Sequence, residues 1–334
     1  MNPPTALRTV RWMVRDTFRQ SLATKLFWVM LAVTAVCTLV CLSVDVTGDM
    51  PSVKYDFEVP SYLPKGEAKK LGEEKVRADG VRVVSGEATL GFGTVKLPLG
   101  RDRVDAVRYI QVWLAAFLAD TLGVLLALLW TAGLLPTFLE PQSATVLLAK
   151  PVPRWAILFG KYLGVVLFVT LQAVLFVAGT WAALGLKTGV WNGAYWLAVP
   201  LLVVNFGVFY AVSAFLAVVT RSTVAAAFGT LLFWMLCWTM NYTHLWVTAH
   251  PWDGVTPASQ FLLDAGYWVM PKPVDLGGIF FDAVGAQGFS AKLPELEAVQ
   301  KKGLFHPELA VLSSLAFAAA TLGLAAYEFR ETDY

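Results

Sequence analysis

The chain has 334 residues, of which 57% are hydrophobic and only 15% are charged, and its mean hydropathy is +0.60. Soluble globular proteins usually carry about 25% charged residues, so these values exclude a water-soluble domain and a disordered chain. The net charge of +2 is small and no basic block stands out, so a nucleic-acid partner is not expected. The composition predicts a polytopic membrane protein.

Residues 1–25 are predicted to form an amphipathic helix that lies on the membrane surface. Arg8, Arg11, Arg15 and Arg19 follow the edge of an apolar arc on the helical wheel. That arc consists of Leu7, Val10, Met13, Val14, Phe18 and Leu22. A helix of this kind buries its apolar face in lipid while its basic side chains reach the phosphates. The alternative is a solvated basic flank without special geometry.

Six apolar runs are long enough to cross a bilayer, because a core about 30 Å thick needs roughly 20 helical residues. None of them alternates polar and apolar residues as a membrane barrel strand does, so we predict an all-α bundle. The first run is longer than the apolar part of a signal peptide, and we expect it to be retained. The spans are predicted at residues 26–44, 109–135, three within 155–247 (about 155–184, 195–219 and 224–247), and one within 307–334.

Lysine and arginine residues near the span ends orient the bundle, because they are enriched on the cytoplasmic side. They occur in residues 1–25, in the connection 136–154 and at Arg221, which six alternating spans place on one side. Lys187 is the exception. We therefore predict a multi-pass membrane protein with both termini in the cytoplasm.

The connection 45–108 is predicted to lie on the outer side of the membrane. Residues 67–79 are charged and compatible with a helix, whereas 81–84 and 88–97 are typical of short strands with turns. We therefore predict a small extracytoplasmic α/β insertion between spans 1 and 2.

The second long outer connection, residues 248–306, carries the apolar pieces 261–270 and 276–281. Both pieces are too short to span a bilayer. They are either re-entrant helices or an ordinary amphipathic cover packed on the bundle.

The most informative segment joins spans 2 and 3, at residues 136–154. Pro141 helps to end span 2, and a short apolar run with a cap-like Ser143 follows. Pro151 and Pro153 stop that run. A short, stiff and partly apolar helix between two spans is suited to fill a groove in a soluble partner.

The start of span 3 carries two basic residues and two glycines. Arg154 and Lys161 are seven residues apart and so lie on one helical face. Gly160 and Gly164 form a Gly-x-x-x-Gly pattern, which permits the close approach of a second helix.

This region resembles the membrane subunits of type-2 ABC exporters. Those subunits often carry an acid, a hydroxyl residue, a Leu-Leu pair, a Pro-Val-x-Arg and a Gly-Lys pair in this order. The matching positions are Glu140, Ser143, Leu147, Leu148, Pro151, Arg154, Gly160 and Lys161. Ser143 stands where threonine is usual, and Pro141 and Gln142 fill positions that are often basic or glycine.

The resemblance implies that residues 140–154 are a coupling helix that docks into a separate ABC ATPase subunit. It also implies an exporter permease of the cell inner membrane that works beside a second permease chain, in a homodimer or a heterodimer, and in contact with membrane lipid. The chain has no phosphate-cradling Gly-x-x-x-x-Gly-Lys-Ser/Thr motif. We therefore expect no enzymatic activity of its own, no cofactor and no metal site.

Asp120 lies inside the second predicted span, where a charge costs about 2.5–3.5 kcal/mol on insertion scales. Two interpretations are open: a residue of the substrate pathway, and a structural hydrogen-bond partner for a neighbouring span. Asn205 and Gln172 are predicted to form hydrogen bonds between helices.

Two other functions are also open. A membrane scaffold or sensor would bind a partner through the long outer connections. An intramembrane enzyme would use Asp120, although no nucleophile or metal ligands accompany it in the sequence.

Overall fold

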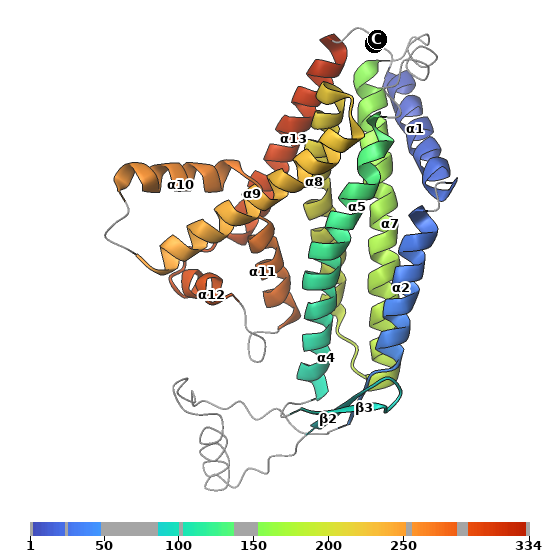
Figure 1. Cartoon of the computed structure of the whole chain (residues 1–334), viewed down its shortest axis with the longest axis vertical. Helices are drawn as coiled ribbons and strands as arrows, with labels where there is room; N and C mark the ends of the chain where they lie inside the picture. The colour runs from blue at the N-terminus through green and yellow to red at the C-terminus, as the bar shows by residue number, and fades with distance from the viewer. Residues whose placement is uncertain are drawn as a thin grey trace.

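The structure, a computed structural model, describes residues 3–23, 26–47, 86–99, 103–136, 153–251, 256–285 and 293–331. Its long helices form one elongated bundle, and a small sheet lies at one end (Figure 1). These helices are α1 (Pro3–Ala23), α2 (Leu26–Leu42), α7 (Arg154–Thr188), α8 (Ala198–Thr220), α9 (Thr223–Ala249) and α13 (Pro307–Glu331). One further continuous helical unit, Arg103–Leu134, consists of four consecutive segments. They are α4 (Arg103–Val112), the π-helical η1 (Trp113–Gly123), α5 (Val124–Thr131) and η2 (Ala132–Leu134).

Within the described residues, five helices are long and apolar enough to cross a membrane. The bent pair of α1 and α2, whose axes differ by 69°, makes a sixth when the pair is counted as one span. The five are Arg103–Leu134, Arg154–Thr188, Gly193–Thr220, Thr223–Ala249 and Pro307–Glu331. The chain is therefore an all-α polytopic membrane protein, as the composition predicted.

The helix α8 lies at the centre of the bundle, with α5, α7, α9 and α13 packed around it. Phe206, Val208 and Phe209, which point in different directions from α8, are at most 1% exposed. The outer helix α9 instead leaves Phe228 and Leu232 61% and 67% exposed. A helix that is apolar on an exposed face is suited to contact lipid.

Short turns join α7, α8 and α9. Gly189 ends α7 with a φ of 73°, and Arg221 ends α8 with a φ of 53°. Ser222 then caps α9, because its side chain accepts a hydrogen bond from the Ala225 N–H. These tight ends make the three helices neighbours in space.

The connection after α2 contains a three-stranded antiparallel sheet in the order β1 (Asp45–Thr47), β2 (Gly86–Leu90) and β3 (Val95–Leu99). The strands and turn expected within residues 88–97 agree with the β2–β3 hairpin, whose turn has positive φ at Gly91, Phe92 and Gly93. Strand β1 was not predicted. The segments 67–79 and 81–84 lie outside the described residues.

The second long connection forms three short helices, α10 (Pro257–Val269), α11 (Pro273–Val284) and α12 (Pro294–Lys301). They lie on the flank of the bundle beside α9 (Figure 1). Leu276 and Phe280 of α11 are 3% exposed, so this helix covers the bundle. Phe261 and Leu262 of α10 are instead 71% and 68% exposed. The helix α11 is thus a packed cover, whereas α10 keeps an unpacked apolar face.

Candidate functional site

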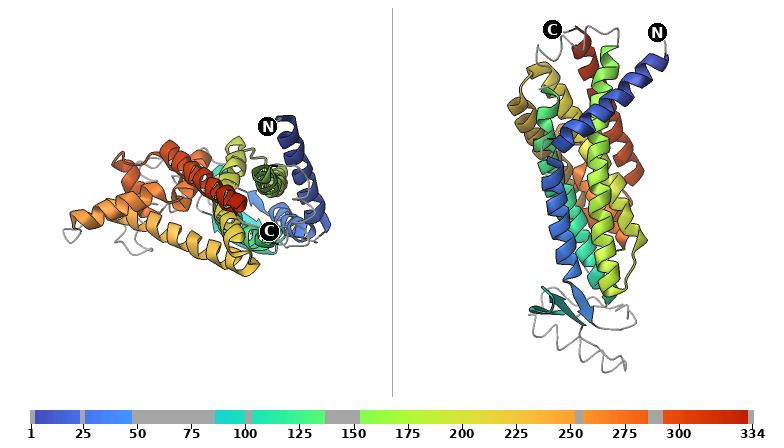
Figure 2. Two further views of the ribbon diagram at one scale, coloured as in Figure 1. Left: turned by 90° about the horizontal axis from the view of Figure 1, so that it is seen from above. Right: turned by 90° about the vertical axis from the view of Figure 1, so that its right-hand side faces the viewer.

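The described part of the predicted coupling motif lies in the first two turns of α7. Arg154, Gly160 and Lys161 belong to this helix, at the end of the bundle where α1 begins and α13 ends (Figure 2). The other predicted positions lie outside the described residues: Glu140, Ser143, Leu147, Leu148 and Pro151. The site is therefore built from α7 and its neighbours.

The two glycines of α7 face α1 at a distance that excludes any side chain. A Cβ atom on Gly160 would lie 2.8 Å from the Met13 Cβ and 3.1 Å from the Val10 Cα. A Cβ atom on Gly164 would lie 2.8 Å from the Thr17 Oγ1. The prediction that the Gly-x-x-x-Gly pattern admits a second helix is confirmed, and that helix is α1.

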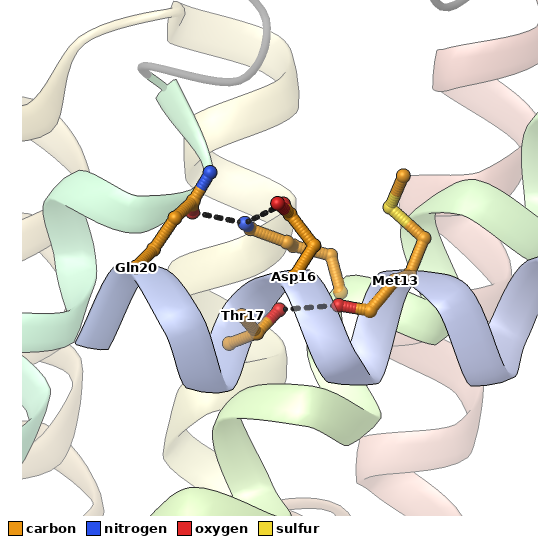
Figure 3. A network of polar contacts seen from close by, with 5 residues as sticks. Met13, Asp16, Thr17 and Gln20 are labelled. Carbon is orange, nitrogen blue, oxygen red and sulfur yellow. Dashed lines mark hydrogen bonds and ion pairs between the residues drawn. The ribbon is translucent and has the colours of Figure 1, made fainter. Parts of the chain in front are cut away.

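Lys161 is buried between α7 and α1, where two polar side chains of α1 meet its ammonium group. Its Nζ donates a hydrogen bond to Gln20 Oε1 at 2.5 Å and lies 3.6 Å from Asp16 Oδ2. Asp16 and Gln20 point to the same side of α1, one turn apart (Figure 3). A buried ammonium group is tolerated only with such partners, so Lys161 fixes the position of α1 on α7.

Apolar and small polar residues complete this contact. Met13 is 1% exposed and Thr17 is fully buried, and the Thr17 hydroxyl donates to the Met13 carbonyl at 2.9 Å (Figure 3). The ring of Phe168 in α7 meets those of Phe18 and Phe27 at 5.9 Å and 6.2 Å. The amphipathic helix predicted at residues 1–25 thus packs one face on protein.

Arg154, the first residue of α7, contacts the far end of the chain. Its Nη1 donates to the main-chain oxygens of Phe329 and Arg330, at 3.4 Å and 3.0 Å. The last carbonyls of a helix lack partners within the helix and carry negative charge, so a guanidinium group stabilises them. Arg154 thereby links the start of α7 to the end of α13.

Asp120 lies in the π-helical η1 and contacts the central helix. The Asn205 side chain of α8 donates to Asp120 Oδ1 at 2.7 Å. Asp120 also borders a small pocket with Leu276 and Gly277 of α11. The hydrogen bond predicted for Asn205 is present, and it supports the structural interpretation of Asp120. The prediction for Gln172 was wrong, because its amide has no hydrogen-bond partner among the described residues.

A buried polar cluster around α11 was missed in the sequence. Asp275 accepts hydrogen bonds from the Tyr267 hydroxyl at 2.6 Å and from Asn241 Nδ2 at 3.0 Å. The Lys272 Nζ donates to Ser313 Oγ at 2.6 Å and lies 4.7 Å from the centre of the Tyr267 ring. The signal that could have found it is a lysine and an aspartate within an otherwise apolar stretch.

Burial shifts the ionisation of this cluster. It lowers the pKa of Lys272 to about 8, although the nearby Asp275 opposes the shift. Burial also raises the pKa of Asp275 above its ordinary value, against the hydrogen bonds from Tyr267 and Asn241. These contacts join α9, α10, α11 and α13, so the cluster holds the second connection on the bundle.

A comparison with known families identifies the chain. The family described as "ABC-2 family transporter protein" matches residues 11–250, more than two thirds of the 334 residues. The match begins in α1, runs through the α7 site and ends after α9. A search of the curated proteins finds no match. The chain therefore belongs to the ABC-2 transporter family and is a membrane component of an ABC transporter system.

Proposed function

We propose that the chain is the permease subunit of an ABC exporter of the cell inner membrane. It moves a substrate with ATP that a separate ATPase subunit hydrolyses, and a second permease chain completes the pathway. The observation that carries this proposal is the start of α7, where residues 140–154 lead into a helix joined to both α1 and α13. Force on that segment reaches three helices at once.

The length of α7 suits it to carry a movement through the membrane. With 35 residues at about 1.5 Å per residue, it extends roughly 50 Å, more than the thickness of a bilayer core. Lys161 holds α1 on this helix and Arg154 holds the end of α13. We infer that closure of the ATPase pair moves α7, α1 and α13 together and changes access to the pathway.

The Gly-Lys pair supports a transport subunit without its own nucleotide site. A phosphate-cradling loop needs free main-chain N–H groups and a lysine that reaches the phosphates. Here Met13 covers Gly160, and Lys161 is buried against Gln20 and Asp16. ATP hydrolysis is accordingly assigned to the partner.

The orientation of the chain follows from the same end of the bundle. The basic helix α1 begins there, and α13 ends there (Figure 2). Basic residues favour the cytoplasmic side. We propose that this end faces the cytoplasm and that the sheet lies on the outer side.

Copurification with the ATPase tests the coupling assignment. The ATPase would be the product of a neighbouring gene that encodes a phosphate-binding loop. Replacing both Leu147 and Leu148 by Asp is expected to reduce the copurified ATPase at least about tenfold, because buried apolar anchors dominate such interfaces. The matched control is Lys187→Ala, at the opposite end of α7, which should leave the complex intact.

Arg154→Ala is expected to keep the complex and to lower the transport-linked ATPase activity, because the contact with α13 is lost. Unchanged association in the double leucine variant, together with unchanged activity in Arg154→Ala, would contradict the coupling role. A phenotype that needs residues 52–103 but no ATPase would favour the scaffold or sensor.

A further inference from the structure

A groove of about 200 Å³, open along one side, lies between α2, η1, α5 and α7. Its walls include Val33 of α2, Leu122 of η1, and Leu126 and Trp130 of α5. None of the described residues that line it carries a charge. Grooves with apolar walls and few polar groups are typical of sites for small molecules.

One amide side chain in this groove has no partner. Gln172 of α7 is 4% exposed, and neither its Nε2 nor its Oε1 forms a hydrogen bond within the described part of the chain. Other polar residues of α7 behave differently: the hydroxyls of Thr170 and Thr180 donate to main-chain oxygens at 2.7 Å. A buried amide without a partner is unfavourable. Gln172 would therefore be stabilised by a hydrogen-bonding group on another molecule.

The position of Gln172 limits what that group is. It lies eighteen residues after Arg154 in the 35-residue α7, near the middle of the membrane span. Water is scarce at this depth, and an isolated charge is strongly disfavoured. The partner must therefore arrive on an apolar molecule and must be uncharged.

The groove is open to such a molecule from the lipid side. Val33, Leu122 and Leu126 on its rim are 50%, 42% and 43% exposed. Asp120 is absent from its walls and borders a separate pocket beside α11, where Asn205 contacts it. The groove thus excludes Asp120, which is the only ionisable residue in η1.

We propose that this groove binds an uncharged lipid-like molecule with one polar group that both donates and accepts hydrogen bonds. Both atoms of the Gln172 amide are covered in this structure, so the flexible side chain turns toward the groove to pair with an amide or a hydroxyl of the ligand. The apolar body fills the space between α2 and α5. The proposal concerns binding and holds whether or not the bound molecule is transported.

A brominated probe tests this site, because bromine quenches tryptophan fluorescence at short range and Trp130 lines the groove. The full-length protein in lipid nanodiscs is titrated with 9,10-dibromostearamide and, in parallel, with 9,10-dibromooctadecane, which lacks the amide. The signal is the part of the quenching that disappears in Trp130→Phe. The amide probe is expected to reach half-saturation at a concentration about fivefold lower, as one neutral hydrogen bond implies.

Variants distinguish the contribution of the Gln172 hydrogen bond from that of the volume of the groove. Gln172→Leu removes the unpartnered amide, and the preference for the amide probe is expected to disappear. The matched control is Gln111→Leu, because Gln111 is also fully buried but lies outside the groove, and the preference should remain. Ala173→Phe narrows the groove and is expected to weaken both probes.

Three results would overturn the proposal: equal half-saturation by the two probes, a preference that survives Gln172→Leu, or a groove filled by a second copy of the chain. The last is tested with a bismaleimide on Leu126→Cys, where a cross-linked dimer shows that α5 is an interface. ATPase copurification does not involve these residues, so the result is independent of the coupling test.

Discussion

Single residues at the start of α7 determine how α1 is held. Gly160 and Gly164 admit the α1 backbone, and Lys161 supplies a charge that Asp16 and Gln20 complement. The glycines and the lysine depend on one another, because the lysine reaches α1 only when the helices are close. The Gly-Lys pair, which the resemblance places in the coupling motif, thus packs α1 on α7.

Gly160→Ala is expected to destabilise the protein by about 1–3 kcal/mol, because the new methyl group overlaps Met13 and the Val10 backbone. The measurement is thermal unfolding in detergent. Gly323→Ala in α13 is the matched control, since a Cβ there meets no atom within 4 Å, and alanine favours a helix by up to about 1 kcal/mol. Equal melting temperatures for the two variants would contradict close packing at Gly160.

At the scale of elements, α10 and α11 depend on a polar cluster rather than on an apolar stripe alone. The Lys272 ammonium group binds Ser313 of α13, and the Asp275 carboxyl group binds Asn241 of α9. Each short helix begins with a proline that is tolerated in a first turn. The cluster replaces the long apolar contact that helices of 13 and 12 residues cannot make.

The cluster predicts a stability that rises with pH. The pKa of Lys272 is about 8 in the folded protein, below the ordinary 10.5, so between pH 8 and 10 the unfolded chain binds more protons. Stability therefore increases across this window, by on the order of 1–3 kcal/mol. The increase should be lost in Lys272→Met and kept in Lys301→Met, which alters an exposed lysine of α12. Thermal unfolding at several pH values measures it, and an unchanged slope in Lys272→Met would refute the assignment.

At the scale of the whole molecule, the sequence predicted the apolar helices that cross the membrane. It did not predict which polar side chains, far apart in the chain, pair with one another. The apolar spans, the amphipathic α1 and the β2–β3 hairpin follow from local patterns, because hydropathy, helical period and turn residues act over short distances. The pairing of Lys161 with Gln20 crosses 141 residues, and that of Asp120 with Asn205 crosses 85. A polar residue in a span indicates that a partner exists, but only the packed bundle identifies it.

The proposed orientation predicts opposite labelling of the two ends. Thr94→Cys, in the β2–β3 turn, should react with a membrane-impermeant maleimide in intact cells with an opened outer envelope. Arg19→Cys, on the exposed side of α1, should react only after the membrane is permeabilised. The wild-type protein, whose Cys41 and Cys237 are buried, measures the background. Labelling of Arg19→Cys in intact cells would reverse the orientation.

The contact between Lys161 and α1 also has a consequence for biosynthesis. The chain is made from its N-terminus at about 5–20 residues per second, so Asp16 and Gln20 precede Lys161 by roughly 7–30 s. During that interval Asp16 and Gln20 of α1 lack the lysine that they contact in the folded protein. When α7 enters the bilayer, its lysine meets a counter-charge already in place. The helix α1 thus provides a preformed surface on which α7 packs.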